Sequence, residues 1–257
     1  MIDYVSAIHQ RISRRSYLPA PIEEEKLAVL KQEIEKANQE SGLTITFLED
    51  GSEAFEGVKS YGMFSGVRSL IVLKGWEETE HLREKAGYYG ERLVLAATAL
   101  GLGTCWVGGT FDKESEVFAL PKNEQIVCVI TVGHVAQSSF KEKVIRGVMH
   151  RKTKPIEEMV RTDRPLSPEE EAAMELVQHA PTARNTQKVV FSFFGDRITA
   201  GVPDDAPFDL VDLGICKLHF EIGMRELFPQ CRFAWGNGGA FNPAAERLRE
   251  DNFCVRK

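Results

Sequence analysis

The sequence predicts an α+β protein with two related lobes. Segments with helical apolar spacing are interspersed with short apolar or alternating segments of the kind that form strands. One plan occurs twice: a helix with an acidic start, then strands, then an apolar helix entered through glycine. With 257 residues, 43% hydrophobic and 27% charged, the chain can bury a core without disulfides or metal. We place the lobes at residues 1–163 and 164–257.

In the first lobe, residues 3–13 predict a short helix. A second helix follows, with Pro21 in its first turn and Gly42 at its end, because proline suits a helix start and glycine a helix end. A third helix, at 84–102, has the broad apolar stripe of a helix in the middle of a domain. The strands are expected at 43–50, 69–76, 105–109 and 124–135.

Between the two cycles, residues 150–165 predict a basic, polar crossing. Ser167 and the acidic residues after it predict a capped helix over 166–180. Residues 188–202 predict a β-hairpin that turns near Gly195-Asp196. A second apolar helix at 208–228 and a strand at 231–236 complete the second lobe.

Composition excludes several classes of protein. The net charge of −6 argues against a general nucleic-acid binder. The longest apolar run, "VLAATALGLG", is too short to span a bilayer, and the N-terminus lacks the apolar core of a signal peptide. The five cysteines are scattered and the six histidines lack zinc-ligand spacing, so we expect reduced thiols, no metal and a cytoplasmic protein.

Three segments together resemble the nitroreductase-like FMN flavoenzymes. They are "SRRSYLPAPI", "GYYGERLVLAATALGLGTCWVGG" and "APTARNTQ"; the crossing "RKTKPIEEMV" is similar to the basic tail of that family. In ordinary members the proline-led turn follows the first long helix, whereas here it follows the corresponding helix of the second cycle. The order resembles single-chain members in which a duplicated chain imitates the usual homodimer. The resemblance implies a monomer that acts as a pseudo-dimer, with one flavin site per chain.

The resemblance also implies a set of site residues. Arg14 and Ser16, with Arg15 beside them, would bind the FMN phosphate, and Arg151 and Lys152 would form a second phosphate clamp. The strand end would offer backbone N–H groups to the flavin ring, and the late turn would line the ring and the ribityl chain. The strand-end residues are Val107, Gly108 and Gly109, and those of the turn are Pro181, Thr182, Ala183, Asn185 and Gln187. Each segment also has a plainer interpretation, as a solvated arginine pair, a basic linker, a strand-end turn or a helix-to-strand turn.

The function implied is an FMN-dependent oxidoreductase with NAD(P)H as co-substrate and a nitroaromatic or quinone-like acceptor; no side-chain acid is required. Leu18 stands where the family often has a cation, and Lys188 follows the turn, either as its replacement or as a strand-edge lysine. Two alternatives stay open. One is a flavin enzyme with another reaction, such as dehalogenation, with residues 49–66 as its candidate lid; the other is a non-enzymatic protein that has lost FMN.

Overall fold

The computed structural model describes residues 2–56, 62–136, 152–195, 197–229, 232–235 and 245–248. The chain divides into two compact units, Met1–Leu82 with Tyr89–Arg151 and Arg83–Tyr88 with Lys152–Lys257. Within the described ranges, no helix combines the length and the apolar character that a membrane span requires. The same ranges contain no group of His, Cys, Asp and Glu side chains that could hold a metal ion.

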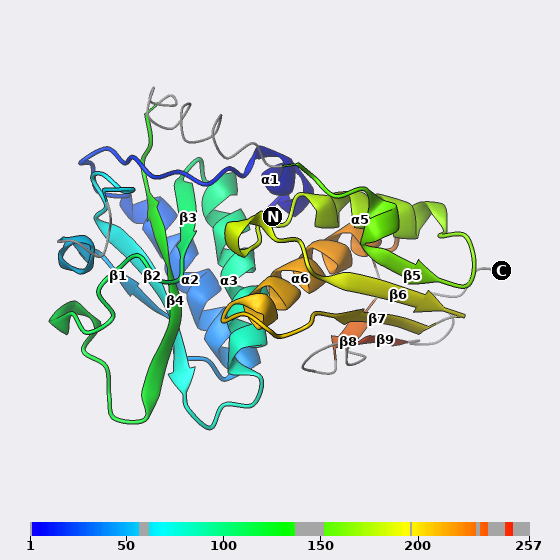
Figure 1. Cartoon of the computed structure of the whole chain (residues 1–257). Coiled ribbons are helices and arrows are strands. Elements are labelled where there is room, and N and C mark those ends of the chain that lie inside the picture. The colour runs from blue at the N-terminus through cyan, green and yellow to red at the C-terminus, as the bar shows by residue number, and fades with distance from the viewer. Residues whose placement is uncertain are drawn as a thin grey trace. The chain divides into compact units, whose positions relative to one another are not determined.

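The first unit is built on a four-stranded antiparallel sheet in the order β1-β2-β4-β3 (Figure 1). Strands β2 and β4 lie at its centre because both are almost continuously apolar and are buried along nearly their whole length. The elements up to β4 are α1 (Tyr4–Gln10), α2 (Glu24–Ser41), β1 (Thr46–Leu48), η1 (Ser52–Phe55), β2 (Ser69–Trp76), α3 (Leu82–Ala99), β3 (Gly103–Val107), η3 (Glu116–Phe118) and β4 (Glu124–Gly133).

The predicted helices and strands of this unit are confirmed, with one correction. Helix α2 begins at Glu24 after an N-cap at Glu23, so Pro21 lies outside its first turn. Two prolines close together favour extended backbone before the acidic run, and the helix starts only where that run supplies Glu24 and Glu25 to the first turn. The predicted end is correct, because Gly42 follows the helix in the left-handed region with φ of 73°.

The second unit contains a three-stranded sheet in the order β5-β6-β7 and a separate antiparallel pair, β8-β9. Strands β6 and β7 form the predicted hairpin, whose turn contains Gly195; Asp196 lies outside the described residues. Strand β5 pairs in parallel with β6 and corrects the prediction of a polar crossing without a strand. The elements are η4 (Ile156–Glu158), β5 (Val160–Thr162), α5 (Pro168–Gln178), η5 (Ala183–Asn185), β6 (Val190–Phe194), β7 (Arg197–Gly201), α6 (Asp209–Leu227), β8 (Arg232–Trp235) and β9 (Ala245–Leu248).

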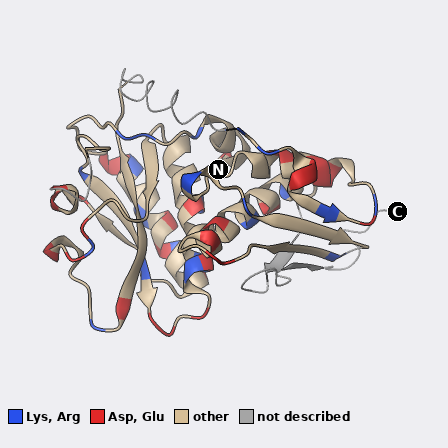
Figure 2. Ribbon diagram, viewed as in Figure 1, with Lys and Arg blue, Asp and Glu red and all other residues tan. Residues whose placement is uncertain are grey.

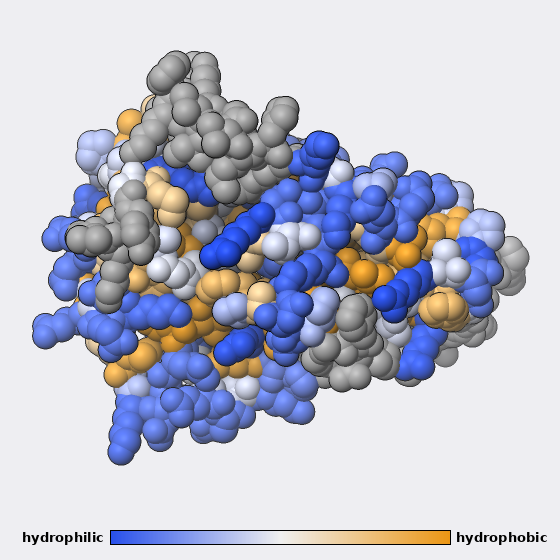
Figure 3. Space-filling view, in the orientation of Figure 1, coloured by the Kyte–Doolittle hydropathy of each residue, from blue (hydrophilic) through white to orange (hydrophobic). Residues whose placement is uncertain are grey.

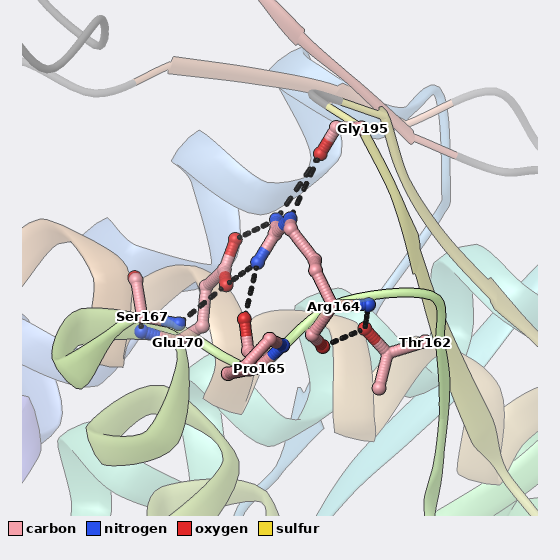
Figure 4. Close-up of polar contacts among 6 residues, drawn as sticks. All are labelled: Thr162, Arg164, Pro165, Ser167, Glu170 and Gly195. Carbon is pink, nitrogen blue, oxygen red and sulfur yellow. Dashed lines mark hydrogen bonds and ion pairs between the residues drawn. The ribbon is translucent and has the colours of Figure 1, made fainter.

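Helix α5 has the predicted cap at Ser167. The hydroxyl of Ser167 accepts the N–H of Glu170, and the Glu170 carboxylate accepts the N–H of Ser167, which completes a capping box. Figure 4 shows Arg164 placing its guanidinium against both oxygens of that carboxylate, at 2.7 and 2.8 Å, and against the carbonyl of Gly195. Three acidic residues fill the first turn of α5, which Figure 2 shows in red, as the helix dipole favours. The helix start is therefore fixed both locally and to the hairpin turn.

The core of the second unit is centred on α6. Phe220 packs against Phe191 and Phe193 of β6, with ring centroids 4.9 and 5.9 Å apart. Most residues of α6 are buried, including the charged Lys217 and Glu221.

On the face that Figure 3 shows, hydrophilic residues cover most of the surface, with apolar residues between them.

The first residues of α3 complete this core. A Cβ atom at Gly214 of α6 would lie 2.0 Å from the backbone carbonyl oxygen of Glu84, so only glycine permits this approach. Beside it, Lys217 forms a buried ion pair with Glu84. The hydroxyl of Tyr88 donates to Glu221 at 2.7 Å. The start of α3 is therefore tied to α6 by backbone packing, a buried charge pair and a hydrogen bond.

Candidate functional site

The arginine-serine segment of the first unit, residues 14–16, lies against the sheet. The N–H of Arg14 donates to the carbonyl of Thr104 in β3 at 2.8 Å, and that of Tyr17 donates to the carbonyl of Ser65 at 2.9 Å. The Arg14 guanidinium donates to the carbonyl of Ala136. Arg14, Arg15 and Ser16 are all half-buried. The segment predicted to hold phosphate is therefore fixed at the end of the sheet where β3 starts.

Tyr17 anchors this segment from inside the core. Its hydroxyl lies 2.8 Å from the carbonyl oxygen of Arg14 and 2.6 Å from Oγ1 of Thr131 in β4. Burial raises the pKa of Tyr17 well above its usual value, so the side chain is neutral at physiological pH. A neutral, fully bonded tyrosine holds the backbone of its neighbours rigid, which favours precise placement of Arg14 and Ser16.

The other predicted residues of this unit follow β3. Val107 is buried at the strand end, Gly108 is half-buried and Gly109 is exposed. A Cβ atom at Gly109 would meet no atom within 4 Å, so the backbone there faces open space. Upstream, the indole N–H of Trp106 donates to Glu91 at 2.9 Å, which fixes the strand against α3. Room beside exposed backbone is what a flat ligand ring needs.

The late turn lies in the second unit and has unusual backbone geometry. Three of its residues have positive φ: Arg184 at 53°, Asn185 at 58° and Gln187 at 48°. The N–H of Gln187 donates to the hydroxyl of Thr182 at 3.2 Å, which closes the turn on itself. Pro181, just before it, is buried. Residues other than glycine adopt positive φ at a cost, and such strain concentrates at binding and switch sites.

The turn is joined to the basic segment that precedes β5. The side chain of Gln187 accepts the N–H of Lys154 and donates to the carbonyl of Lys152, both at 2.9 Å. The ammonium group of Lys154 donates to the carbonyl of Gln187 at 2.9 Å, and Asn185 donates to the carbonyl of Lys152 at 3.3 Å. The structure therefore brings the predicted Lys152 together with Asn185 and Gln187. Arg151, the other predicted clamp residue, lies outside the described residues.

Two polar groups at this turn were missed from the sequence. The hydroxyl of Thr186 is buried and has no hydrogen-bond partner among the residues that the structure describes, which is rare for a buried polar group. The carboxylate of Asp212, in the first turn of α6, accepts the N–H of Ala183 with both oxygens at 3.0 Å. Burial raises the pKa of Asp212 to about 7, against the lowering effect of that N–H. Two acids three residues apart at the start of an apolar helix were the available signal for Asp212.

Leu18 and Lys188 are the two positions that depart from the family pattern, and the structure describes the surroundings of both. Leu18 is an apolar side chain that is 43% exposed. The ammonium group of Lys188 contacts Asp205 and lies 3.0 Å from Oδ2 of Asp209. Those partners raise the pKa of Lys188. Its charge is therefore matched by carboxylates, which disfavours a role as the replacement cation.

The segment proposed as a lid, residues 49–66, is described only in part, because 57–61 lie outside the described residues. Its 3₁₀ turn places Phe55 against Phe64, with ring centroids 5.3 Å apart. Both rings pack against the core of the first unit. The described part of this segment is therefore a packed loop.

Comparison with known proteins places these features in context. The family described as "Putative TM nitroreductase" matches residues 3–224. The crystal structure of a "putative nitroreductase" from Thermotoga maritima is 23% identical and has a TM-score of 0.57, covering 90% of this chain and 88% of that one. That likeness confirms the predicted mixed fold with an antiparallel sheet. No curated protein matches the sequence.

Smaller solved proteins resemble about half of the chain. An FMN-dependent nitroreductase from Clostridium difficile is 19% identical with a TM-score of 0.45, covering 52% of this chain and 89% of that one. A "putative nitroreductase in complex with FMN" from Desulfovibrio desulfuricans is 22% identical with a TM-score of 0.41, covering 53% of this chain and 90% of that one.

Proposed function

Because the chain belongs to the "Putative TM nitroreductase" family, we propose that it is an FMN-dependent oxidoreductase. NAD(P)H would be the electron donor, and a nitroaromatic or quinone-like small molecule the acceptor. When bound, FMN would supply two-electron transfer between these substrates, a reaction that amino-acid side chains cannot perform. The protein residues would bind and orient the cofactor, and none is required as an acid or base.

In the first unit, Arg14 and Ser16 would bind the phosphate, with Arg15 beside them. An arginine fork and a hydroxyl are suitable donors to a phosphate dianion. Their backbone is already fixed by Thr104, Ser65 and Tyr17, so little conformational freedom would be lost on binding. Further along β3, the backbone N–H groups of Gly108 and Gly109, next to Val107, would face the ring.

In the second unit, the turn from Pro181 to Gln187 would line the ring and the ribityl chain. The single observation that carries the proposal is this strained turn, whose Asn185 and Gln187 side chains are tied to the backbone of Lys152. The residues fit a polar ligand, because the buried Thr186 hydroxyl has no partner within the described part of the chain, and a ribityl hydroxyl or a ring carbonyl would supply one. Lys152 and Arg151 would add positive charge on the phosphate side.

We propose further that a single chain binds one flavin and does so as a monomer. The predicted duplication motivates this idea: the arginine-serine segment occurs only in the first cycle and the proline-led turn only in the second. A stoichiometry of one FMN per chain is expected, and two per chain would contradict this proposal.

The first experiment is a titration of the apoprotein with FMN, followed by flavin fluorescence and visible absorption. Saturable binding, and bleaching of the bound flavin near 450 nm on addition of NADH or NADPH, are expected, since bleaching reports flavin reduction. Transfer of those electrons to a quinone would establish the reaction class. If the apoprotein does not bind FMN even in large excess, the result would instead favour the alternative of a non-enzymatic protein that has lost the cofactor.

A further inference from the structure

The strained turn is held at its start by a buried carboxylate. Both oxygens of Asp212 lie 3.0 Å from the backbone nitrogen of Ala183, and the Asp212 residue is only 4% exposed. Ala183 is the residue just before the positive-φ pair Arg184 and Asn185. The position of its N–H therefore sets the direction in which the chain enters the strained part of the turn.

The carboxylate of Asp212 has few other partners. An ionised carboxylate can accept about four hydrogen bonds, yet within the described ranges the N–H of Ala183 is its one hydrogen-bond donor. The nearby cation, Lys188, contacts Asp205 and Asp209 instead. Burying a carboxylate with so little compensation is costly, and a neutral residue could fill the same space without that cost.

Charged and titratable groups reach α6 from three other segments. On α6 itself, Asp209 lies one turn before Asp212. Lys188, from the segment before β6, and Asp205, from the segment before α6, both bond to Asp209. From the start of α3, Glu84 and Tyr88 face α6. The α3 groups bond to Lys217 and Glu221, further along the helix. Asp212 is therefore the acid in this group whose bond reaches the turn.

We propose that Asp212 is a positioning residue for flavin binding: its ionised carboxylate fixes the N–H of Ala183 and thereby the shape of the turn that receives the cofactor. A hydrogen bond to an ionised acceptor is about twice as strong as one to a neutral acceptor. Loss of the charge would loosen the entry to the turn and weaken cofactor binding. The inference rests on the proposed function, since it concerns how the same turn binds FMN.

The test uses three variants of the full chain and FMN as the probe. Asp212→Asn keeps an oxygen acceptor without charge, and Asp212→Ala removes both. Asp209→Asn is the matched control, because Asp209 is 2% exposed on the same helix but bonds to Lys188 and the loop before α6 instead of to Ala183. The dissociation constant for FMN is measured for each protein from pH 5.5 to 8.5.

At pH 8.5 we expect Asp212→Ala to bind FMN about 10- to 100-fold more weakly than the native protein, and Asp209→Asn within about threefold of it. Asp212→Asn should bind about 3- to 10-fold more weakly at pH 8.5 but nearly equally at pH 5.5, where the native carboxyl is itself neutral. Titration of the FMN phosphate affects both proteins alike and cancels in their ratio. A role limited to packing would give the same ratio at every pH.

Results that would contradict the proposed function differ from results that would contradict only the role of Asp212. A native protein that does not bind FMN at any pH overturns the proposed function, and the role of Asp212 with it. A native protein that binds FMN while all three variants bind equally well overturns only the role of Asp212. An affinity ratio between native protein and Asp212→Asn that does not change with pH also overturns it.

Discussion

The indole nitrogen of Trp106 lies 2.9 Å from a carboxylate oxygen of Glu91, a fully buried residue in the middle of α3. A second buried donor, the Arg11 side chain, lies 3.9 Å from the other oxygen. Helix and strand in the first unit are therefore joined by a charged hydrogen bond inside the core. Breaking one partner of such a contact leaves the other buried and unsatisfied.

We expect Glu91→Ala to lower the free energy of unfolding by about 3 kcal/mol or more, because it leaves the Trp106 N–H and Arg11 buried without an acceptor. Glu91→Gln keeps an acceptor oxygen of the same reach and should cost clearly less. Denaturant unfolding, monitored by circular dichroism, measures both. Equal losses for the two variants would show that the hydrogen bond to Trp106 contributes little.

Arg14→Ala is expected to weaken FMN binding by about 1.5–3 kcal/mol, because a charge-assisted contact with phosphate is lost. Riboflavin, which lacks the phosphate, should bind the variant and the native protein equally. Isothermal titration with both ligands measures the difference. Unchanged FMN affinity would mean that the arginine-serine segment is wrongly assigned.

Thr186→Val should change stability and binding in opposite directions. Removing a buried hydroxyl that has no partner should leave the apoprotein as stable or stabilise it by about 1 kcal/mol. If FMN bonds to that hydroxyl, its affinity for the variant should fall by about 1 kcal/mol. Thr186→Ser, which keeps the hydroxyl, is the control. Thermal melts of the apoprotein and FMN titrations together decide whether the hydroxyl serves the fold or the ligand.

Asp212 should make the apoprotein more stable in mild acid than at neutral pH. Its pKa is about 7 in the folded state and about 3.9 when unfolded, so between these values the folded state binds the extra proton. The contribution is complete below pH 4 and is lost as the pH rises through 7. It is on the order of 2–4 kcal/mol. The stability difference between native protein and Asp212→Asn, measured from pH 4.5 to 8, should follow that window.

This pH effect and the positioning role concern different quantities. Burial makes the ionised carboxylate expensive for the fold, whereas the ionised form makes the stronger hydrogen bond to Ala183. Stability that does not vary between the native protein and Asp212→Asn across the window would contradict the raised pKa. Such a result would not contradict the hydrogen bond between Asp212 and Ala183.

The sequence predicted the elements whose local signals are strong. The apolar run of β2, the serine cap of α5 and the glycine after α2 each have a local physical cause, and each is found where expected. Strand β5 was missed because three half-polar residues carry no periodicity. Its residues pair with residues 31 positions later in the sequence, such as Val160 with Phe191. Such pairing is set by tertiary contacts that a local pattern cannot reveal.

In the candidate site too, residues with a local sequence signal could be predicted and residues whose role depends on tertiary contacts could not. Residues recognised by motif, such as Asn185 and Gln187, do lie in one hydrogen-bonded turn with Lys152. Asp212 and Thr186 carry no motif, because their significance depends on a burial and a partner, or lack of one, that exist only after folding. That Arg14 and the turn residues bind FMN stays a prediction.

The glycine contact between α6 and the start of α3 has a consequence for dissecting the chain. Six residues that come early in the sequence supply part of the packing of the second unit, including the Glu84 carbonyl against Gly214. A fragment beginning at Lys152 would expose the surface of α6 that packs against the start of α3, and it would lack Glu84, which pairs with Lys217. A proteolytic fragment that lacks Arg83–Tyr88 should therefore be less stable than the same residues within the parent chain.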